Sequence, residues 1–188
     1  MQASLRLVIF KIYYCIIMEV KCSDAFKLKC PKDLAFLDRP QFTKRAGIIP
    51  YFIYRDVVYL VLGIDSKSGD VADFGGGCRR DATPITCALR ELREETRGAI
   101  RVNPSNITHI VLSNVNHEKS RVEQTILFVK IAPVNEYDIN ERFQRTRGLN
   151  SSHYEMNRII IVPYKNFRYY NIWYGLRQNI DILDNLDL

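Results

Sequence analysis

The order of apolar and polar positions along the chain predicts a series of strands interrupted by one well-marked helix. Residues 46–54 (AGIIPYFIY) and 57–64 (VVYLVLGI) are β-branched and aromatic runs separated by Arg55-Asp56, which predicts a hairpin. The second run is apolar on both faces, as expected for a central strand. A short strand over residues 71–74 then leads into a run of three glycines.

The segment after the glycines predicts a helix over residues 84–97. Thr83 suits the N-cap, Pro84 suits the first helical position, and Gly98 follows the predicted end. At about 100° per residue, one stripe of this helix is apolar and is expected to face the core. Its members are Ile85, Leu89, Leu92 and Thr96.

The second half of the chain predicts three more strands and a final helix. Residues 107–114 and 125–131 are expected to be strands joined by the polar segment 115–124. Residues 136–154 are polar and predict a surface loop. Residues 158–162 predict a strand, and residues 167–183 predict a helix.

The N-terminal part predicts an extension over residues 1–40, before a domain over residues 41–188. Residues 5–18 are apolar, but the run is too short to cross a bilayer and is interrupted by Arg6 and Lys11, so no stable membrane insertion is expected. It is either an extra strand or helix on the domain, or sequence upstream of a start at Met18. Residues 21–43 are charged and contain Pro31 and Pro40, which indicates a connecting or lid segment.

Composition narrows the class of protein. With 188 residues, 47% of them hydrophobic and 26% charged, the chain can bury the core of one folded domain. The formal charge of +6 favours polyanionic partners such as phosphates, RNA or an acidic membrane. The odd number of cysteines, without metal-ligand spacing, argues against zinc and indicates reduced thiols in a cytosolic protein. They are Cys15, Cys22, Cys30, Cys78 and Cys87.

Three glutamates share one face of the predicted helix. When Ile85 is placed at 0° on the helical wheel, Glu94, Glu91 and Glu95 fall at roughly 180°, 240° and 280°. Like charges this close oppose one another by a few tenths of a kcal/mol per pair. A divalent cation would remove the repulsion, and carboxylate oxygens suit Mg²⁺ or Mn²⁺. The alternative is a solvated acidic face paired with neighbouring arginines.

The residues before the helix suggest a phosphate site. Gly75, Gly76 and Gly77 let backbone amides approach an anionic group closely. Arg79 and Arg80 follow at once and could clamp phosphate oxygens, although a solvated pair of arginines is equally common.

Residues 76–98 (GGCRRDATPITCALRELREETRG) resemble the Nudix box. The pattern of that family is Gly, five residues, Glu, seven residues, Arg-Glu, an aliphatic residue, any residue, Glu-Glu, any residue, Gly. The core at residues 90–95 matches it in full. Ala82 stands where the first Glu belongs, and Arg97 stands where the last Gly belongs. The missing Glu normally helps to hold the helix arginine, so either Asp81 replaces it or Arg90 pairs with Glu94.

The resemblance implies an α/β (α+β) fold, a Nudix-like α/β/α sandwich with a mixed central sheet and a loop-helix-loop catalytic motif. It implies a hydrolase that cleaves phosphoanhydride bonds, in which Glu91, Glu94 and Glu95 ligate Mg²⁺ or Mn²⁺ and a bound water attacks phosphorus. Arg90 would hold the carboxylates, and the glycines would shape the site around the diphosphate. The general base would be one of these glutamates or a distant carboxylate such as Glu155.

Substrate class is the least constrained expectation. The chain looks most like the Nudix enzymes of large DNA viruses, which remove the 5′ cap of mRNA and in some cases cleave diphosphoinositol polyphosphates. We therefore expect capped RNA as substrate and a cytoplasmic location, the host cytoplasm if the protein is viral. The alternatives are a small pyrophosphate-containing substrate, such as a free nucleotide or an inositol pyrophosphate, or a non-catalytic nucleotide- or RNA-binding module.

Cap recognition needs aromatic rings for the methylated base. Those available are Tyr51, Tyr54, Tyr169, Tyr170, Trp173 and Tyr174. Tyr170, Trp173 and Tyr174 recur near helical spacing together with Phe167 and Leu176. We therefore expect these rings to form a helical stripe that faces the core.

Overall fold

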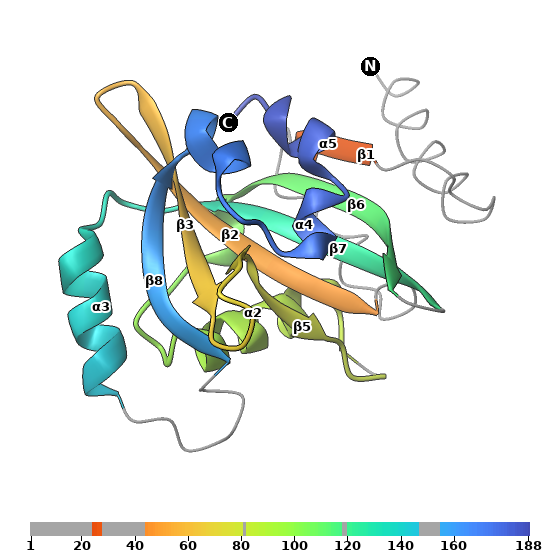
Figure 1. Ribbon diagram of the computed structural model, residues 1–188, viewed down its shortest axis with the longest axis horizontal. Coiled ribbons are helices and arrows are strands. Elements are labelled where there is room, and N and C mark those ends of the chain that lie inside the picture. The colour runs from red at the N-terminus through yellow and green to blue at the C-terminus, as the bar shows by residue number, and fades with distance from the viewer. Residues whose placement is uncertain (1–23, 28–43, 81, 118–119, 147–154) are drawn as a thin grey trace.

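A mixed β-sheet forms the centre of the protein. The computed structural model describes residues 24–27, 44–80, 82–117, 120–146 and 155–188 (Figure 1). In these residues eight strands pair in the order β1-β6-β7-β2-β3-β4, while β5 also pairs with β2 and β8 with β3. The pairing of β2 with β7 is parallel and the other pairings are antiparallel. The strands are β1 (Asp24–Lys27), β2 (Arg45–Tyr54), β3 (Val57–Asp65), β4 (Val71–Ala72), β5 (Phe74–Gly77), β6 (Ile107–His117), β7 (Ser120–Lys130) and β8 (Met156–Pro163).

Helical segments cover both faces of the sheet, so the predicted α/β/α sandwich is confirmed. One core packs the sheet against the longer helices, and a second core packs it against the short C-terminal segments. Alternate residues of β2 point into the two cores, so Ile48 belongs to the first core and Ile49 to the second. The helical segments are α2 (Pro84–Glu95), η2 (Pro104–Asn106), α3 (Glu136–Arg145), η4 (Tyr164–Tyr169), α4 (Tyr174–Arg177) and α5 (Ile180–Asp184).

The predicted hairpin is formed by β2 and β3. Arg55 and Asp56 both have positive φ angles, 50° and 59°, as a two-residue turn between twisted antiparallel strands requires. Strand β3 is central, as predicted, because it pairs with β8 on one side and with β2 and then β4 along the other.

Two predicted loops are regular structure instead. Segment 115–124 continues the hairpin of β6 and β7, with Asn116 paired opposite Arg121. Within the predicted loop 136–154, residues 136–145 form α3, whose N-cap Asn135 accepts hydrogen bonds from two backbone amides. Only Ile139 and Phe143 of α3 are buried, one helical turn apart, which is too few apolar residues for a clear sequence signal.

The predicted helix over residues 167–183 is wrong. The chain forms η4, then extends, and then forms the short helices α4 and α5. The extension occurs because Ile172 bridges to Val71 at the sheet edge, and the backbone N–H of Trp173 donates to the carbonyl of Val71 at 2.9 Å. Of the expected core-facing stripe, Phe167 and Leu176 are buried, but Tyr170 and Tyr174 are exposed.

Part of the predicted N-terminal extension joins the sheet, because β1 pairs antiparallel with β6. The apolar run at residues 5–18 and the remainder of segment 21–43 lie outside the described residues. Within the described part of the chain, no helix is both long and apolar enough to span a bilayer.

Candidate active site on helix α2 and strand β5

Helix α2 begins and ends by local backbone chemistry. The hydroxyl of the N-cap Thr83 accepts from the backbone N–H of Thr86 at 3.1 Å, and Pro84 fills the first position, both as predicted. The helix ends at Glu95, two residues earlier than expected. Arg97 and Gly98 then adopt left-handed φ angles of 53° and 73°, so the chain turns away at the position where the Nudix box has its final glycine.

The buried face of α2 carries two glutamates. Glu91 is 6% exposed and Glu95 is 3% exposed, on the same face as Cys87, Ala88 and Leu92. The predicted stripe is therefore only partly correct: Leu92 and Thr96 are buried, whereas Ile85 and Leu89 are only half-buried. Burying two carboxylates in place of aliphatic groups requires space and polar partners in the strand beneath them.

Strand β5 provides that space, because two of its glycines have no room for a side chain. A Cβ atom on Gly76 would lie 2.6 Å from the carboxylate of Glu91, and one on Gly75 would lie 2.7 Å from Oδ2 of Asp73. The backbone N–H of Gly75 donates to Oε2 of Glu95 at 2.9 Å. The glycines expected in a phosphate-binding loop thus pair with β2 and accommodate carboxylates, and only Gly77 faces open space.

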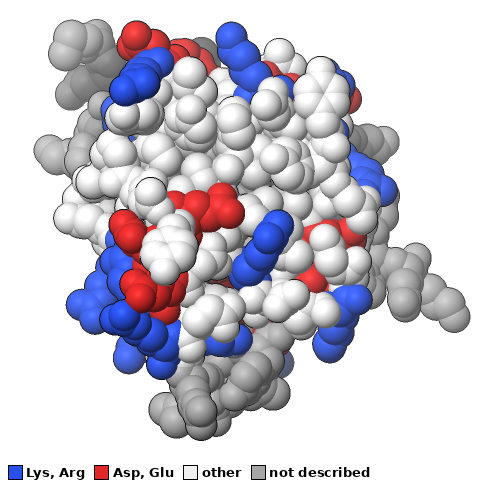
Figure 2. Space-filling view, turned by 60° about the vertical axis from the view of Figure 1, so that its left-hand side comes forward, with Lys and Arg blue, Asp and Glu red and all other residues white. Residues whose placement is uncertain are grey.

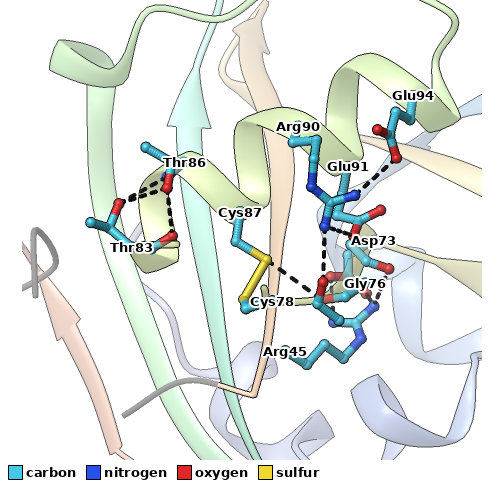
Figure 3. The surroundings of a disulfide bond; sticks show 12 residues. Arg45, Asp73, Gly76, Cys78, Thr83, Thr86, Cys87, Arg90, Glu91 and Glu94 are labelled. Atoms are coloured by element: carbon cyan, nitrogen blue, oxygen red, sulfur yellow. Dashed lines mark hydrogen bonds and ion pairs between the residues drawn. A yellow bond between two sulfur atoms is a disulfide. The ribbon is translucent and has the colours of Figure 1, made fainter. Parts of the chain in front are cut away.

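Arg90 connects the outer edge of α2 to β5 (Figure 3). Its guanidinium lies 2.5 Å from Oε1 of Glu91 and 2.9 Å from Oε2 of Glu94, and it donates to the carbonyl of Gly77 at 2.9 Å. Of the two arrangements considered for this arginine, the structure shows the pairing with Glu94. Asp81, the other candidate partner, lies outside the described residues.

A buried ion pair beneath β5 was not predicted. Arg45 bonds both carboxylate oxygens of the fully buried Asp73 at 2.9 Å, and also donates to the carbonyl of Gly75 at 3.1 Å. Its guanidinium lies 4.3 Å from the centre of the Trp173 ring. In the sequence, the sign of this ion pair is a single acidic residue, Asp73, within the otherwise apolar run 71–74. Its partner lies 28 residues away, at the start of a different strand.

The carboxylates of the site repel one another. Burial raises the pKa of Glu95 well above its ordinary value, and the charges of Asp73, Glu91 and Glu155 raise it further, while Arg45 opposes them. Burial and the charges of Glu94 and Glu155 raise the pKa of Glu91, and Arg90 opposes them. Both buried glutamates are therefore held near other negative charges.

Glu155 contributes to this electrostatic cluster although it is distant in the sequence. It is exposed just before β8, and its backbone carbonyl accepts from the N–H of Ser66 at 2.7 Å. Arg79 and Arg80 are exposed in the segment after β5. As the side chains are placed in the described residues, no three His, Cys, Asp or Glu lie close enough together to hold a metal ion.

Two of the cysteines expected to be reduced thiols form a disulfide instead. Cys78 follows β5 and Cys87 lies in α2, with their Cα atoms 5.3 Å apart (Figure 3). The structure thus corrects the prediction for this pair, because helix α2 packs against strand β5 and brings the two cysteines together. The bond links the strand that carries Gly76 to the helix that carries Glu91.

Comparison with known proteins supports the fold. No protein-family model and no curated protein matches the sequence. Among solved structures, the Bacillus subtilis pyrophosphohydrolase BsRppH matches with TM-score 0.52 and 13% identity, over 86% of each chain. C. elegans Ap4A hydrolase matches with TM-score 0.50 and 10% identity, over 76% of this chain and 93% of that one. A Nudix hydrolase from M. smegmatis, RenU, gives TM-score 0.48 at 13% identity, over 78% and 91%. The two matches with TM-scores of 0.50 and 0.52 show that the chain shares their fold, the α/β/α sandwich implied by the resemblance to the Nudix box.

The role of the glycines predicts a contrast between two alanine variants. A Cβ on Gly47 would lie 1.8 Å from Oδ2 of Asp73, whereas a Cβ on Gly77 meets no atom within 4 Å. We expect Gly47→Ala to lower the free energy of unfolding by about 1–3 kcal/mol through overpacking at the ion pair. Gly77→Ala should change it by less than about 0.5 kcal/mol. Urea denaturation measures both, and equal effects would contradict the packing argument.

The disulfide predicts a redox-dependent stability. Reduction by dithiothreitol should lower the free energy of unfolding by about 2–3 kcal/mol, because a loop of this size is no longer closed in the unfolded chain. The control is the double variant Cys78→Ser/Cys87→Ser, whose stability dithiothreitol should leave unchanged. A wild-type melting temperature that is insensitive to the reductant would show that the bond does not form.

The buried glutamate predicts a pH dependence in protein kept free of metal by chelator. The pKa of Glu95 is higher in the folded protein than its ordinary value of 4.5, so folding favours the protonated carboxyl. The contribution of Glu95 to stability is therefore largest below pH 4.5 and falls as the pH rises towards the folded pKa. Relative to Glu95→Gln, the wild type should lose up to about 1.4 kcal/mol per pH unit in this window. Parallel stability curves would contradict the assignment.

Proposed function

We propose that this protein is a divalent-metal-dependent hydrolase that cleaves a phosphoanhydride bond, and that its substrate is capped RNA. The observation that carries the proposal is the pair of buried glutamates, Glu91 and Glu95, packed against the glycine strand β5. A folded protein seldom buries two carboxylates side by side without a role for their charge. The names of the neighbours, a pyrophosphohydrolase and an Ap4A hydrolase, agree with this reaction class.

The chemistry of the three glutamates suits a hard cation. Glu91, Glu94 and Glu95 offer carboxylate oxygens from two turns of one helix. The pKa values of Glu91 and Glu95 are raised first by burial and then by neighbouring negative charge, and Arg90 and Arg45 act against this rise. These three glutamates would hold Mg²⁺ or Mn²⁺, and Glu91 and Glu94 would give up part of their present bonding to Arg90. Such an ion, when bound, supplies the positive charge that polarises a phosphoryl group.

The chain's own residues position this site. The backbone N–H of Gly75 orients Glu95, and Arg90 orients Glu91 and Glu94. The ion pair of Arg45 and Asp73 keeps β5 in place, because Arg45 also binds the carbonyl of Gly75. A site held by such supporting bonds is pre-organised before the substrate arrives.

Three exposed side chains complete the proposed roles. Arg79 and Arg80 follow shortly after Gly77, the last residue of β5, and would bind phosphate oxygens of the substrate. Glu155 would accept the proton of the attacking water, since its charge acts on both buried glutamates while its side chain remains exposed to solvent.

The choice of capped RNA rests on charge and on aromatic groups beside the site. The net charge of +6 favours a polyanion. Tyr174 is 37% exposed and packs against Trp173 with ring centroids 4.5 Å apart, and Trp173 in turn contacts Arg45. A methylated base could stack on the exposed ring of Tyr174, close to the strand that lines the site.

Product analysis tests the proposal. Purified protein with Mg²⁺ or Mn²⁺ is incubated with cap-labelled RNA, free cap analogue, nucleoside triphosphates and an inositol pyrophosphate. We expect methylated guanosine diphosphate from capped RNA. Preferred hydrolysis of a small substrate would retain the reaction class and reject capped RNA. Ligand binding without turnover of any substrate would reject catalysis and indicate a binding module.

Substitution of the proposed ligands gives a sharper test. Glu94→Gln and Glu95→Gln should each lower kcat/KM by at least about 100-fold, because a neutral amide is a poor ligand for a hard cation. The matched control is Glu123→Gln, a substitution of an exposed glutamate in β7, which should retain full activity. An unchanged rate in Glu94→Gln would exclude that residue as a metal ligand.

A further inference from the structure

Two adjoining hollows lie at the end of α2, on the flank of the helix away from Glu91. The first, of about 330 Å³, has an aliphatic floor that includes Leu92 and Ile100, and Arg93 and Arg101 stand beside it. The second, of about 420 Å³, lies between Ala99, Arg142 and Arg145. Gly98 and Arg101 line both hollows, so they form one continuous surface, which we call the arginine cleft.

The charge of the arginine cleft is unbalanced. Among the described residues, four arginines line the two hollows, and no Asp or Glu does. Arg93 and Arg101 are exposed and have no ion-pair partner in the described part of the chain. Among the arginines of the cleft, as far as the described residues go, only Arg145 forms an ion pair, with Glu141 at 2.6 Å. Such a group of like charges raises the local concentration of anions and favours an anionic ligand.

The backbone around α2 leaves the cleft open. The carbonyls at the end of the helix are already satisfied, because the N–H groups of Thr96, Arg97 and Gly98 bond to them. A Cβ atom added to Gly98, whose φ is 73°, would meet no atom within 4 Å, so the boundary between the hollows is not blocked. Arg97 does not line either hollow, since its guanidinium lies 4.0 Å from the Phe143 ring of α3.

The shape and lining favour an extended ligand that is recognised through its phosphates. Of the side chains that the structure describes, none with an aromatic ring lines either hollow, so those that form the cleft offer no surface for base stacking. Its charges come from two separate helices and the segment after α2, which suits successive anionic groups along a strand. Figure 2 brings the α3 side of the molecule forward and shows Lys and Arg side chains gathered at its lower left, next to a group of Asp and Glu side chains.

We propose that the arginine cleft binds phosphodiester groups of the RNA body, downstream of the cap. This inference rests on the proposed function, because it assigns the remainder of the same substrate. Arg93 lies about 160° from Glu91 around α2, so the cleft and the carboxylate site are separated by roughly the helix diameter of 10–12 Å. A strand that leaves the carboxylate site can thus reach the cleft around the end of the helix, where Glu94 and Gly98 lie.

The first test measures binding of an uncapped, fluorescently labelled single-stranded RNA by anisotropy. The double variant Arg93→Ala/Arg101→Ala should bind at least about 10-fold more weakly than wild type. The slope of log Kd against log salt should fall by about 1.4, because each phosphate contact on a single strand contributes about 0.7. The control Lys130→Ala/Lys165→Ala removes the same charge from other exposed positions and should change neither value. Equal melting temperatures show that all variants fold.

The second test separates the cleft from the catalytic site. With capped RNA the arginine double variant should show a raised KM, whereas kcat/KM for the free cap analogue should equal that of wild type. Unchanged RNA affinity and salt slope would overturn the proposal even if capped RNA is hydrolysed. The proposal would also be overturned if the double variant lost affinity for tripolyphosphate but bound RNA as well as wild type does. A wild type that hydrolyses no capped RNA would refute the proposed function, while the anisotropy measurement still decides whether the cleft binds RNA.

Discussion

The burial of two glutamates of one helix against a glycine strand is the constraint on which the site depends. Glu91 fits only because Gly76 lacks a side chain, and Glu95 is held by the backbone of Gly75. Neither carboxylate could be accommodated against an ordinary strand, because a Cβ at either glycine would overlap an acidic group. The glycines and the glutamates of the box therefore act as one packing unit, and the unit places negative charge where a cation can neutralise it.

The surrounding bonds hold this unit against its own repulsion. Arg90 links the helix to the carbonyl of Gly77, Arg45 links Asp73 to the carbonyl of Gly75, and the disulfide of Cys78 and Cys87 joins the strand to the helix. The box lacks its first glutamate, since Ala82 occupies that position. In its absence Arg90 is held by Glu91 and Glu94 from its own helix, and the covalent bond adds a second connection between strand and helix.

Charge is distributed differently on the two flanks of α2. One flank carries the carboxylates, which suit a cation and the linked phosphates that it binds. The other flank carries Arg93 and adjoins the further arginines of the cleft, which suit a polyanion directly. A single helix thus separates a proposed reaction site from a proposed site for the rest of the substrate, and both proposals require the net positive charge of the chain.

The sequence by itself determined the Nudix fold class, the β2–β3 hairpin, the start of α2 and the grouping of acidic residues on that helix. These follow from local patterns: alternation in strands, capping by Thr83 and Pro84, and the spacing of the glutamates. Only the tertiary structure decided which side of α2 is buried, because a wheel of the helix cannot show that β5 leaves space for carboxylates. It also decided the pairing of Arg45 with Asp73, the disulfide, the helix α3 and the break after η4. The pairing of Arg45 with Asp73 and the break after η4 depend on contacts between segments distant in the sequence, such as the bond from Trp173 to Val71, whose energy no local pattern contains.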